Sequence, residues 1–323
     1  MKSPDHELET SLLDSAHAVF GSVKPRPAGD GPSQLTRTLG DTGFLGLGVK
    51  EAAGGSGGTM RLAALVAEAA GRHAAAIHYL PSLIGAHAAA AAGDRKLTDA
   101  LVAGTTVAMV FFGDGSGTAR PAPSTSLDPE VFYMQGNRAP VHVARGERRL
   151  EPDHATWLAP DWFDLRLHLD APVTAIDTQS WPNGLELTHS LTAAAILGLV
   201  RGLLTSTSEY VMRRQQFDAP IGSFQAIKHS LADVHIDLVH TRALVFGALD
   251  ALDSGDARAA RLLSLAKVAA DRSAAGASRC LQAMGGIGFT WESDVHRYLK
   301  QALRLRQWPV PHQQLRTSVR PGS

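Results

Sequence analysis

The chain has 323 residues, of which 44% are hydrophobic and 19% are charged, a composition typical of a globular protein with room for two or three packed domains. Its 31 basic residues balance 31 acidic residues. No net field therefore favours nucleic acid or an anionic membrane, and we expect neither as a partner. The single cysteine, Cys280, excludes an internal disulfide framework, and we expect it to be a small buried side chain.

Neither the N-terminal residues nor the apolar runs of the sequence suggest export or membrane insertion. Residues 1–14 are polar and mixed in charge, unlike a signal peptide. The longest apolar runs are alanine-rich and shorter than the ~20 residues needed to span a bilayer. The sequence therefore predicts a soluble, cytoplasmic protein, and no metal site is predicted.

Residues 1–103 are predicted to form a helical domain. Apolar residues recur at helical spacing in four segments, and a loop rich in glycine and proline follows the first of them. The glycines of residues 43–58 exclude a helix or strand interior there and predict a long turn. The expected helices cover residues 7–20, 34–42, 60–72 and 82–92, the last opened by Pro81 and closed by Gly93.

Residues 104–187 are expected to form a small middle β domain, and residues 188–323 a helical bundle. Short β-like runs are separated by Pro, Gly and Asp clusters, at 107–112, 131–134, 141–144, 156–158, 165–169 and 173–176. The helical pattern then returns, at 189–214, 224–253, 257–283 and 293–307. The fold class is therefore mainly α with a small β insert.

The first chemically informative segment is RRQQFDAPIGSFQ, residues 213–225, which lies between two long predicted helices. The adjacent guanidinium groups of Arg213 and Arg214, followed by a turn with Pro220 and Gly222, would suit a diphosphate held by bidentate hydrogen bonds. The alternative is that both arginines only complement the negative end of the preceding helix.

The second segment is QAMGGIGFTWE, residues 282–292. Gly285, Gly286 and Gly288 would let the backbone approach a ligand closely and offer N–H groups to it. The alternative is a glycine C-cap, for which one glycine is enough.

Together and in this order, the two segments resemble the C-terminal helical domain of acyl-CoA dehydrogenases. That family carries an R-x-Q-F turn followed by I-G-x-F-Q, and then a Q-x-x-G-G-x-G-F/Y-x-x-E loop. Residues 39–58, LGDTGFLGLGVKEAAGGSGG, are similar to a glycine-rich turn of the family, with Lys50 in place of proline. The resemblance implies an N-terminal helical domain, a middle β domain and a C-terminal four-helix bundle.

The resemblance also implies FAD as the cofactor, bound across a subunit interface. Position by position, it assigns Arg214 to the FAD diphosphate, Gln225 and Gln282 to its adenine half, and Gly285 and Gly286 to the surrounding loop. Phe217 would line the cofactor or, alternatively, pack in the core beneath it, as would Phe224. The implied partners are an acyl-CoA substrate and a homologous dehydrogenase subunit in a dimer or tetramer.

The family reaction needs a carboxylate base, and the sequence offers no clear one. Residues 303–318 contain no acid where one family group carries its glutamate, and the alternative positions hold Thr188 and Ala195. Glu186 and Glu209 are expected to be solvated, and Glu292 to be structural. The catalytic residue therefore stays unknown.

The middle domain departs from the family as well. The family carries a T-E-P flavin loop after a strand of this domain, and here Gly113-Asp114-Gly115-Ser116-Gly117 stands in its place. The last three of these residues offer N–H and hydroxyl groups to a flavin edge.

Two functions follow from these features. In the first, the chain is a subunit of a heteromeric acyl-CoA dehydrogenase, an FAD-dependent oxidoreductase of lipid metabolism, and completes the FAD site of a catalytic partner. In the second, it is a self-sufficient homo-oligomeric dehydrogenase with an unrecognised base. A third alternative, a helical protein without flavin, leaves the glycine cluster without a use.

Overall fold

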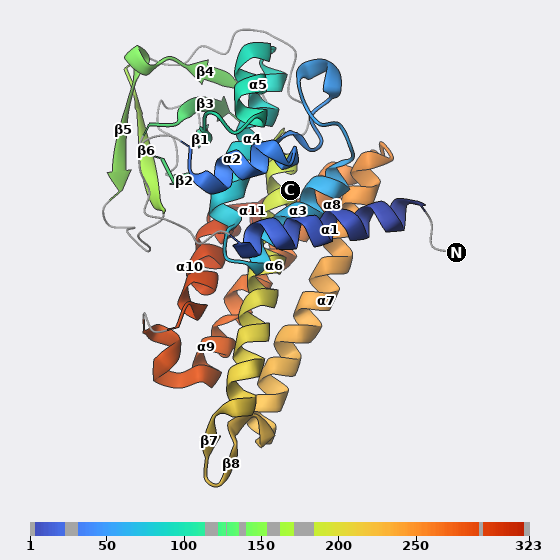
Figure 1. The fold of residues 1–323 in the computed structure, drawn as a ribbon, viewed down its shortest axis with the longest axis vertical. Coiled ribbons are helices and arrows are strands. Elements are labelled where there is room, and N and C mark those ends of the chain that lie inside the picture. The colour runs from blue at the N-terminus through green and yellow to red at the C-terminus, as the bar shows by residue number, and fades with distance from the viewer. Residues whose placement is uncertain are drawn as a thin grey trace. The chain divides into compact units, whose positions relative to one another are not determined.

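A computed structural model describes residues 4–22, 32–113, 122–126, 128–135, 140–153, 162–170, 184–290 and 293–319 (Figure 1). The chain divides into two compact units. The first comprises Met1–Val66 and Ile77–Leu191, and the second comprises Ala67–Ala76 and Thr192–Ser323. The three-domain division expected from the sequence stays a prediction.

The helices of the N-terminal part are α1 (Pro4–Ser22), α2 (Gln34–Asp41), α3 (Met60–Arg72), α4 (Ala76–Ala91) and α5 (Arg95–Val102). Side-chain caps fix two of their starts. The Ser33 hydroxyl accepts a hydrogen bond from the Thr36 N–H at 3.1 Å, and the Asp94 carboxylate accepts one from the Leu97 N–H at 2.9 Å. The glycine-rich turn after α2 contains only two short 3₁₀ segments, Phe44–Gly46 and Glu51–Ala53.

Two predictions for this part were wrong. The helix expected at residues 82–92 begins at Ala76 and contains Pro81 in its interior. Proline costs a helix one hydrogen bond, but burial of the surrounding apolar residues, among them Ile77, Leu80 and Ile84, outweighs that local preference. Helix α5 was not predicted at all.

Two small sheets lie within the first unit. In one, β1 (Ala108–Gly113) pairs in parallel with β3 (Glu130–Gln135), which pairs antiparallel with β4 (Val141–Val143). In the other, β6 (Phe163–Leu169) lies between β2 (Ala122–Ser124) and β5 (Arg148–Asp153), antiparallel to both. Strands β2 and β5 were missed by the sequence analysis. The runs expected at 156–158 and 173–176 lie outside the described residues.

The second unit is a helical bundle, as expected. It contains most of α6 (Gly184–Arg213), then α7 (Gln225–Asp253), α8 (Ala259–Gly276), α9 (Ser278–Met284), α10 (Val295–Arg306) and α11 (His312–Ser318). The single helix predicted over residues 257–283 is broken at Ala277 into α8 and α9, and α11 was not predicted.

Glycines set the crossing of α3 and α6 within this unit. A Cβ added at Gly198 would lie 1.9 Å from the carbonyl oxygen of Glu68, and one added at Gly71 would lie 2.1 Å from that of Ala195. Only glycine permits this approach. Beside the crossing, the Glu68 carboxylate accepts from the Arg242 Nε at 3.0 Å and lies 3.5 Å from the Arg201 guanidinium, which ties α3 to α6 and α7.

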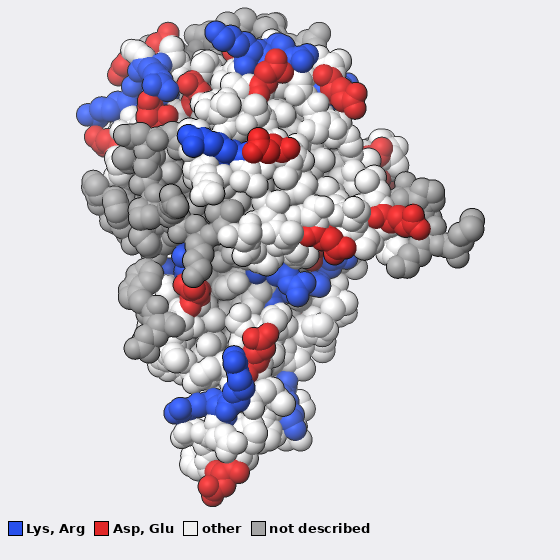
Figure 2. Space-filling view, viewed as in Figure 1, with Lys and Arg blue, Asp and Glu red and all other residues white. Residues whose placement is uncertain are grey.

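Helix α6 is long and apolar enough to span a membrane, but 89% of its most apolar window is buried. Core helices pass the same test of length and composition, so this helix is weak evidence for a membrane span. On the face drawn in Figure 2, basic and acidic side chains lie interspersed, in keeping with the balanced charge of the sequence.

Candidate functional site

The arginine turn predicted at residues 213–225 forms a two-residue β-hairpin after α6. Strands β7 (Gln215–Gln216) and β8 (Ala219–Pro220) pair antiparallel, and the two residues between them, Phe217 and Asp218, have φ angles of 54° and 58°. Positive φ at both central positions is the type I′ geometry, for which Asn-Gly is the usual choice. A phenylalanine here is strained by roughly 1–2 kcal/mol, and such strain is found mainly where a side chain has a function.

The hairpin holds an apolar ring in the open. Phe217 is 89% exposed and Phe224 is 39% exposed, and their ring centroids lie 6.2 Å apart with an interplanar angle of 82°. Packing of Phe217 in the core, one of the two predicted roles, is therefore wrong. The remaining role is contact with a ligand or with a second chain.

The two arginines of the turn differ in their surroundings. The Nε of Arg213 donates to the carbonyl oxygen of Glu209 at 3.2 Å, so Arg213 complements the end of α6. The backbone N–H of Arg214 donates to Tyr210 and its carbonyl accepts from Ile221, at 2.9 and 2.8 Å. Its guanidinium is exposed and forms no ion pair with any residue the structure describes. Arg214 is thus anchored by its backbone and free to bind an anion through its side chain.

The glycine loop combines structural glycines with one that local structure does not require. Gly285 has a φ of 66° and caps α9 through its N–H, so the C-cap interpretation holds for this residue. Gly288 packs closely, because its added Cβ would lie 3.2 Å from the Leu281 carbonyl oxygen. Gly286 has neither constraint and is exposed, with open space where a Cβ would stand. Local structure therefore does not require a glycine at 286, and its assignment to the loop around FAD stays a prediction.

The remaining predicted cofactor residues lie on the same unit. Gln225 is the first residue of α7, Gln282 lies in the last turn of α9, and both are exposed. Helix α7 packs against both α9 and the 3₁₀ turn Ile221–Ser223 that follows the hairpin. The hairpin and α9 both lie at the lower end of the bundle in Figure 1. The assignment of these residues to FAD stays a prediction.

Cys280, on the buried side of α9, is not part of an exposed site. It is fully buried, as expected, and burial raises the pKa of its thiol to about 11. The thiol therefore stays protonated and unreactive at neutral pH.

Neither of the two positions at which a base is expected supplies one. The Thr188 hydroxyl is buried and donates to the Gly184 carbonyl oxygen at 2.9 Å, and Ala195 is fully buried. Glu209 is exposed, as expected, whereas Glu186 is only half-exposed. Glu292, Gly115, Ser116 and Gly117 lie outside the described residues. Among the residues that the structure describes, no group of three or more His, Cys, Asp or Glu side chains is placed to hold a metal ion.

A cavity on the second unit was missed by the sequence analysis. Its arginines come from four different helices, so no single segment carries a recognisable pattern.

Comparison with known proteins agrees with the resemblance. Residues 23–105 match the N-terminal domain of acyl-CoA dehydrogenases, and residues 183–309 match their C-terminal domain. The chain is 33% identical to acyl-CoA dehydrogenase FadE34 of Mycobacterium tuberculosis over 82% of its own length, but it spans only 38% of that relative. It is 29% identical to acyl-CoA dehydrogenase IpdE2 of M. tuberculosis, covering 90% of this chain and 87% of the relative. For IpdE2 of Mycolicibacterium smegmatis the identity is 30%, over 80% and 78%.

Solved structures share the fold at lower identity. The Tcur3481-Tcur3483 steroid ACAD variant superposes with a TM-score of 0.77 at 23% identity, over 97% of both chains. The ChsE4-ChsE5 complex of M. tuberculosis gives 0.78 at 21%, over 99% and 97%. Butyryl-CoA dehydrogenase of Megasphaera elsdenii gives 0.78 at 18%, over 99% and 98%. The predicted fold class is confirmed.

Proposed function

Because the chain belongs to the acyl-CoA dehydrogenase family, we propose that it is the site-completing subunit of a heteromeric enzyme that desaturates an acyl-CoA thioester between its α and β carbons. The observation that carries this proposal is an asymmetry. The groups predicted to reach toward a neighbouring chain's cofactor are present and exposed, whereas the positions at which a base is expected hold Thr188 and Ala195.

FAD is the cofactor of this family, and the exposed residues fit it. The free guanidinium of Arg214 matches the charge and fork geometry of a diphosphate. The open space at Gly286 accepts a close approach, and the amides of Gln225 and Gln282 offer both donors and acceptors to an adenine edge. When bound, FAD would accept the hydride that leaves the β carbon.

In this proposal, the chain's own residues bind and orient but do not move a proton. Arg214 neutralises the diphosphate, and the rigid backbone of the hairpin holds Phe217 against the bound group or the partner. The partner subunit supplies the base and the greater part of the flavin pocket. Two of the similar structures, ChsE4-ChsE5 and Tcur3481-Tcur3483, are themselves named as pairs of different proteins, which supports a paired arrangement here. We place the enzyme in the cytoplasm.

The test is flavin absorbance of the full chain, purified alone and after co-expression with a candidate partner dehydrogenase. We expect a colourless chain alone, and one FAD for each pair of chains in the complex, bleached by acyl-CoA without oxygen. A yellow homo-oligomer of this chain that acyl-CoA bleaches would instead establish the self-sufficient alternative. A complex of the two chains without any flavin would contradict both.

Two neighbouring substitutions test the arginine turn. In the complex, Arg214→Gln should weaken FAD retention by about tenfold or more, since it removes a charge-assisted hydrogen bond. Arg213→Gln is the matched control, because its side chain already serves the end of α6. Equal loss in both variants would mean that general positive charge, and not Arg214, holds the cofactor.

A further inference from the structure

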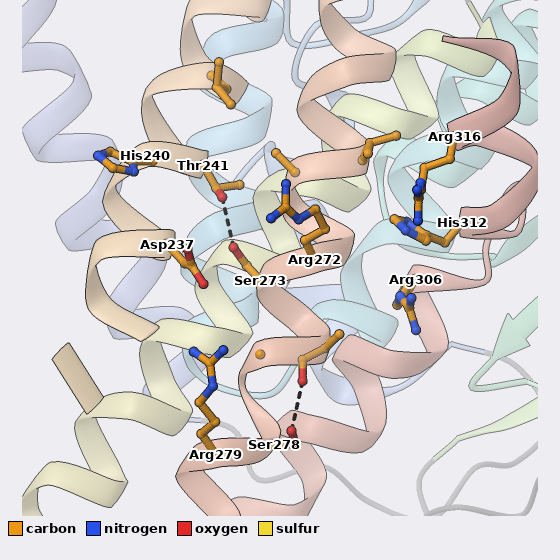
Figure 3. A pocket seen from close by; sticks show the side chains of 15 residues that line it. Asp237, His240, Thr241, Arg272, Ser273, Ser278, Arg279, Arg306, His312 and Arg316 are labelled. Atoms are coloured by element: carbon orange, nitrogen blue, oxygen red, sulfur yellow. Dashed lines mark hydrogen bonds between the residues drawn. The ribbon is translucent and has the colours of Figure 1, made fainter. Parts of the chain in front are cut away.

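A cavity of about 990 Å³ lies on the second unit, among residues of α7, α8, α9, α10 and α11 (Figure 3). Its volume is within the range of small-molecule sites, roughly 300–1,000 Å³. None of its lining residues is among those assigned above to FAD. The cavity and the proposed FAD contacts therefore share no residue.

The charge of the cavity is strongly one-sided. Arg272 of α8, Arg279 of α9, Arg306 of α10 and Arg316 of α11 all line it, and Asp237 of α7 is the one carboxylate in its lining. Figure 3 shows Arg306 and Arg316 beside His312, with Arg272 between this group and α7. Within the described part of the chain, none of the four guanidinium groups forms an ion pair. Four cations from four helices thus line one cavity with a single carboxylate.

The carboxylate next to this cluster is already engaged. Asp271 is fully buried. One of its carboxylate oxygens accepts a hydrogen bond from the Lys267 ammonium, and the other lies 3.2 Å from the His312 Nδ1. Burial lowers the pKa of Lys267, its ion pair with Asp271 opposes this shift, and the nearby charge of Arg306 adds a smaller lowering. Asp271 therefore does not compensate the arginines.

Arg306 also leaves a donor unsatisfied. Its Nε is buried and has no hydrogen-bond partner among the described residues. An unpaired buried donor of a charged group costs about 1–3 kcal/mol, or more, and is found where a ligand or water completes the set. The lining of the cavity also includes the hydroxyl groups of Thr241 and Ser273, which are hydrogen-bonded to each other at 2.9 Å.

We propose that this cavity binds a small molecule with two or more phosphate groups. Guanidinium groups hold phosphate oxygens in bidentate pairs, and several of them are needed to neutralise a multiply charged ligand. A single phosphate would leave most of the cluster unpaired. The site is a second anion site of this chain, independent of its role toward FAD.

The test is calorimetric titration of the full chain with inorganic pyrophosphate at low salt, with orthophosphate as the comparison. We expect saturable 1:1 binding of pyrophosphate, at least about tenfold tighter than that of orthophosphate, and weaker at higher salt. Arg272→Gln and Arg316→Gln, both at exposed positions, should each weaken it by about tenfold.

One control variant and one competing site are tested alongside. Arg261→Gln changes an exposed arginine of α8 outside the cavity and should bind pyrophosphate like the unmodified chain. Arg214→Gln changes the proposed diphosphate contact and shows whether pyrophosphate binds there instead of in the cavity. The proposal is overturned if pyrophosphate does not bind, if orthophosphate binds equally well, or if Arg214→Gln rather than the cavity variants abolishes binding.

Discussion

His87 lies in the interior of the first unit, 8% exposed, with its Nε2 3.0 Å from the carbonyl oxygen of Leu47. Burial lowers the pKa of His87 from 6.5 to about 4, against a smaller opposing effect of this hydrogen bond. The neutral ring is thus favoured in the folded state. Its contribution to stability is fully present above pH 6.5, the unfolded value, and is lost as the pH falls toward 4.

We therefore predict that the free energy of unfolding decreases between pH 6.5 and pH 4 by on the order of 3 kcal/mol on account of His87 alone. The measurement is urea unfolding across this range, compared with His87→Gln, whose amide still donates to Leu47 but does not titrate. The difference between the two curves isolates His87 from the other histidines. Parallel curves would show that this residue is not the cause.

The identity of the exposed residues was easier to predict than their conformation. The pattern of Arg214, Phe217 and Gln225 is visible in the sequence, but the positive φ of Phe217 is not, because phenylalanine rarely adopts it. Strands β7 and β8 pair with each other, and this pairing holds the two residues between them at positive φ. This is why core packing was a plausible role for Phe217 before the structure showed it exposed.

At the scale of elements, the crossing of α3 and α6 depends on the absence of a side chain at Gly198. We predict that Gly198→Ala destabilises the protein by several kcal/mol or prevents folding, since the new Cβ would overlap the Glu68 carbonyl oxygen. Gly247→Ala is the matched control. Gly247 lies within α7, exposed and with open space around it, so alanine should stabilise the helix by about 0.5–1 kcal/mol. Thermal unfolding of both variants tests the pair, and similar shifts would contradict the close crossing.

Long helices with a clear apolar period were predicted well from the sequence. The bounds of α3 agree at both ends, and those of α7 differ by one residue at its start. Errors arose where tertiary contacts outweigh local preference. Pro81 would stop an isolated helix but lies inside the buried α4. Pro152, a residue type that strands disfavour, lies within β5, which pairs with β6. The short helices α5 and α11 have too few turns to show a period.

For the whole molecule, motif matching found the segments that we propose to contact FAD but not the arginine cavity. Arg272, Arg279, Arg306 and Arg316 are far apart in sequence or separated by helix ends, and only the folding of the bundle brings them together. Arg306 and Arg316 also stand in the last turns of α10 and α11, where a basic residue has an ordinary explanation in the helix dipole. Such a site becomes visible only in three dimensions.

Helix α7 has an apolar stripe that the described residues leave uncovered. Ile236 and Val239, three residues apart and therefore neighbours on one face, are both 50% exposed on the side away from its buried residues, whereas the exposed Leu244 lines the arginine cavity. Large apolar side chains gathered on one helix face are typical of a subunit interface.

We predict that Val239→Asp weakens association of the chain with itself or with its partner subunit by about tenfold or more, because a charge would be buried without a counterion. Size-exclusion chromatography with light scattering measures this. Leu8→Asp, at a 55% exposed leucine of α1, controls for the general effect of a new charge and should leave the assembly unchanged. If Val239→Asp leaves the mass of the assembly and its dependence on concentration unchanged, the stripe is not an interface, and the exposed Phe217 of the hairpin is the next position to test with the same substitution.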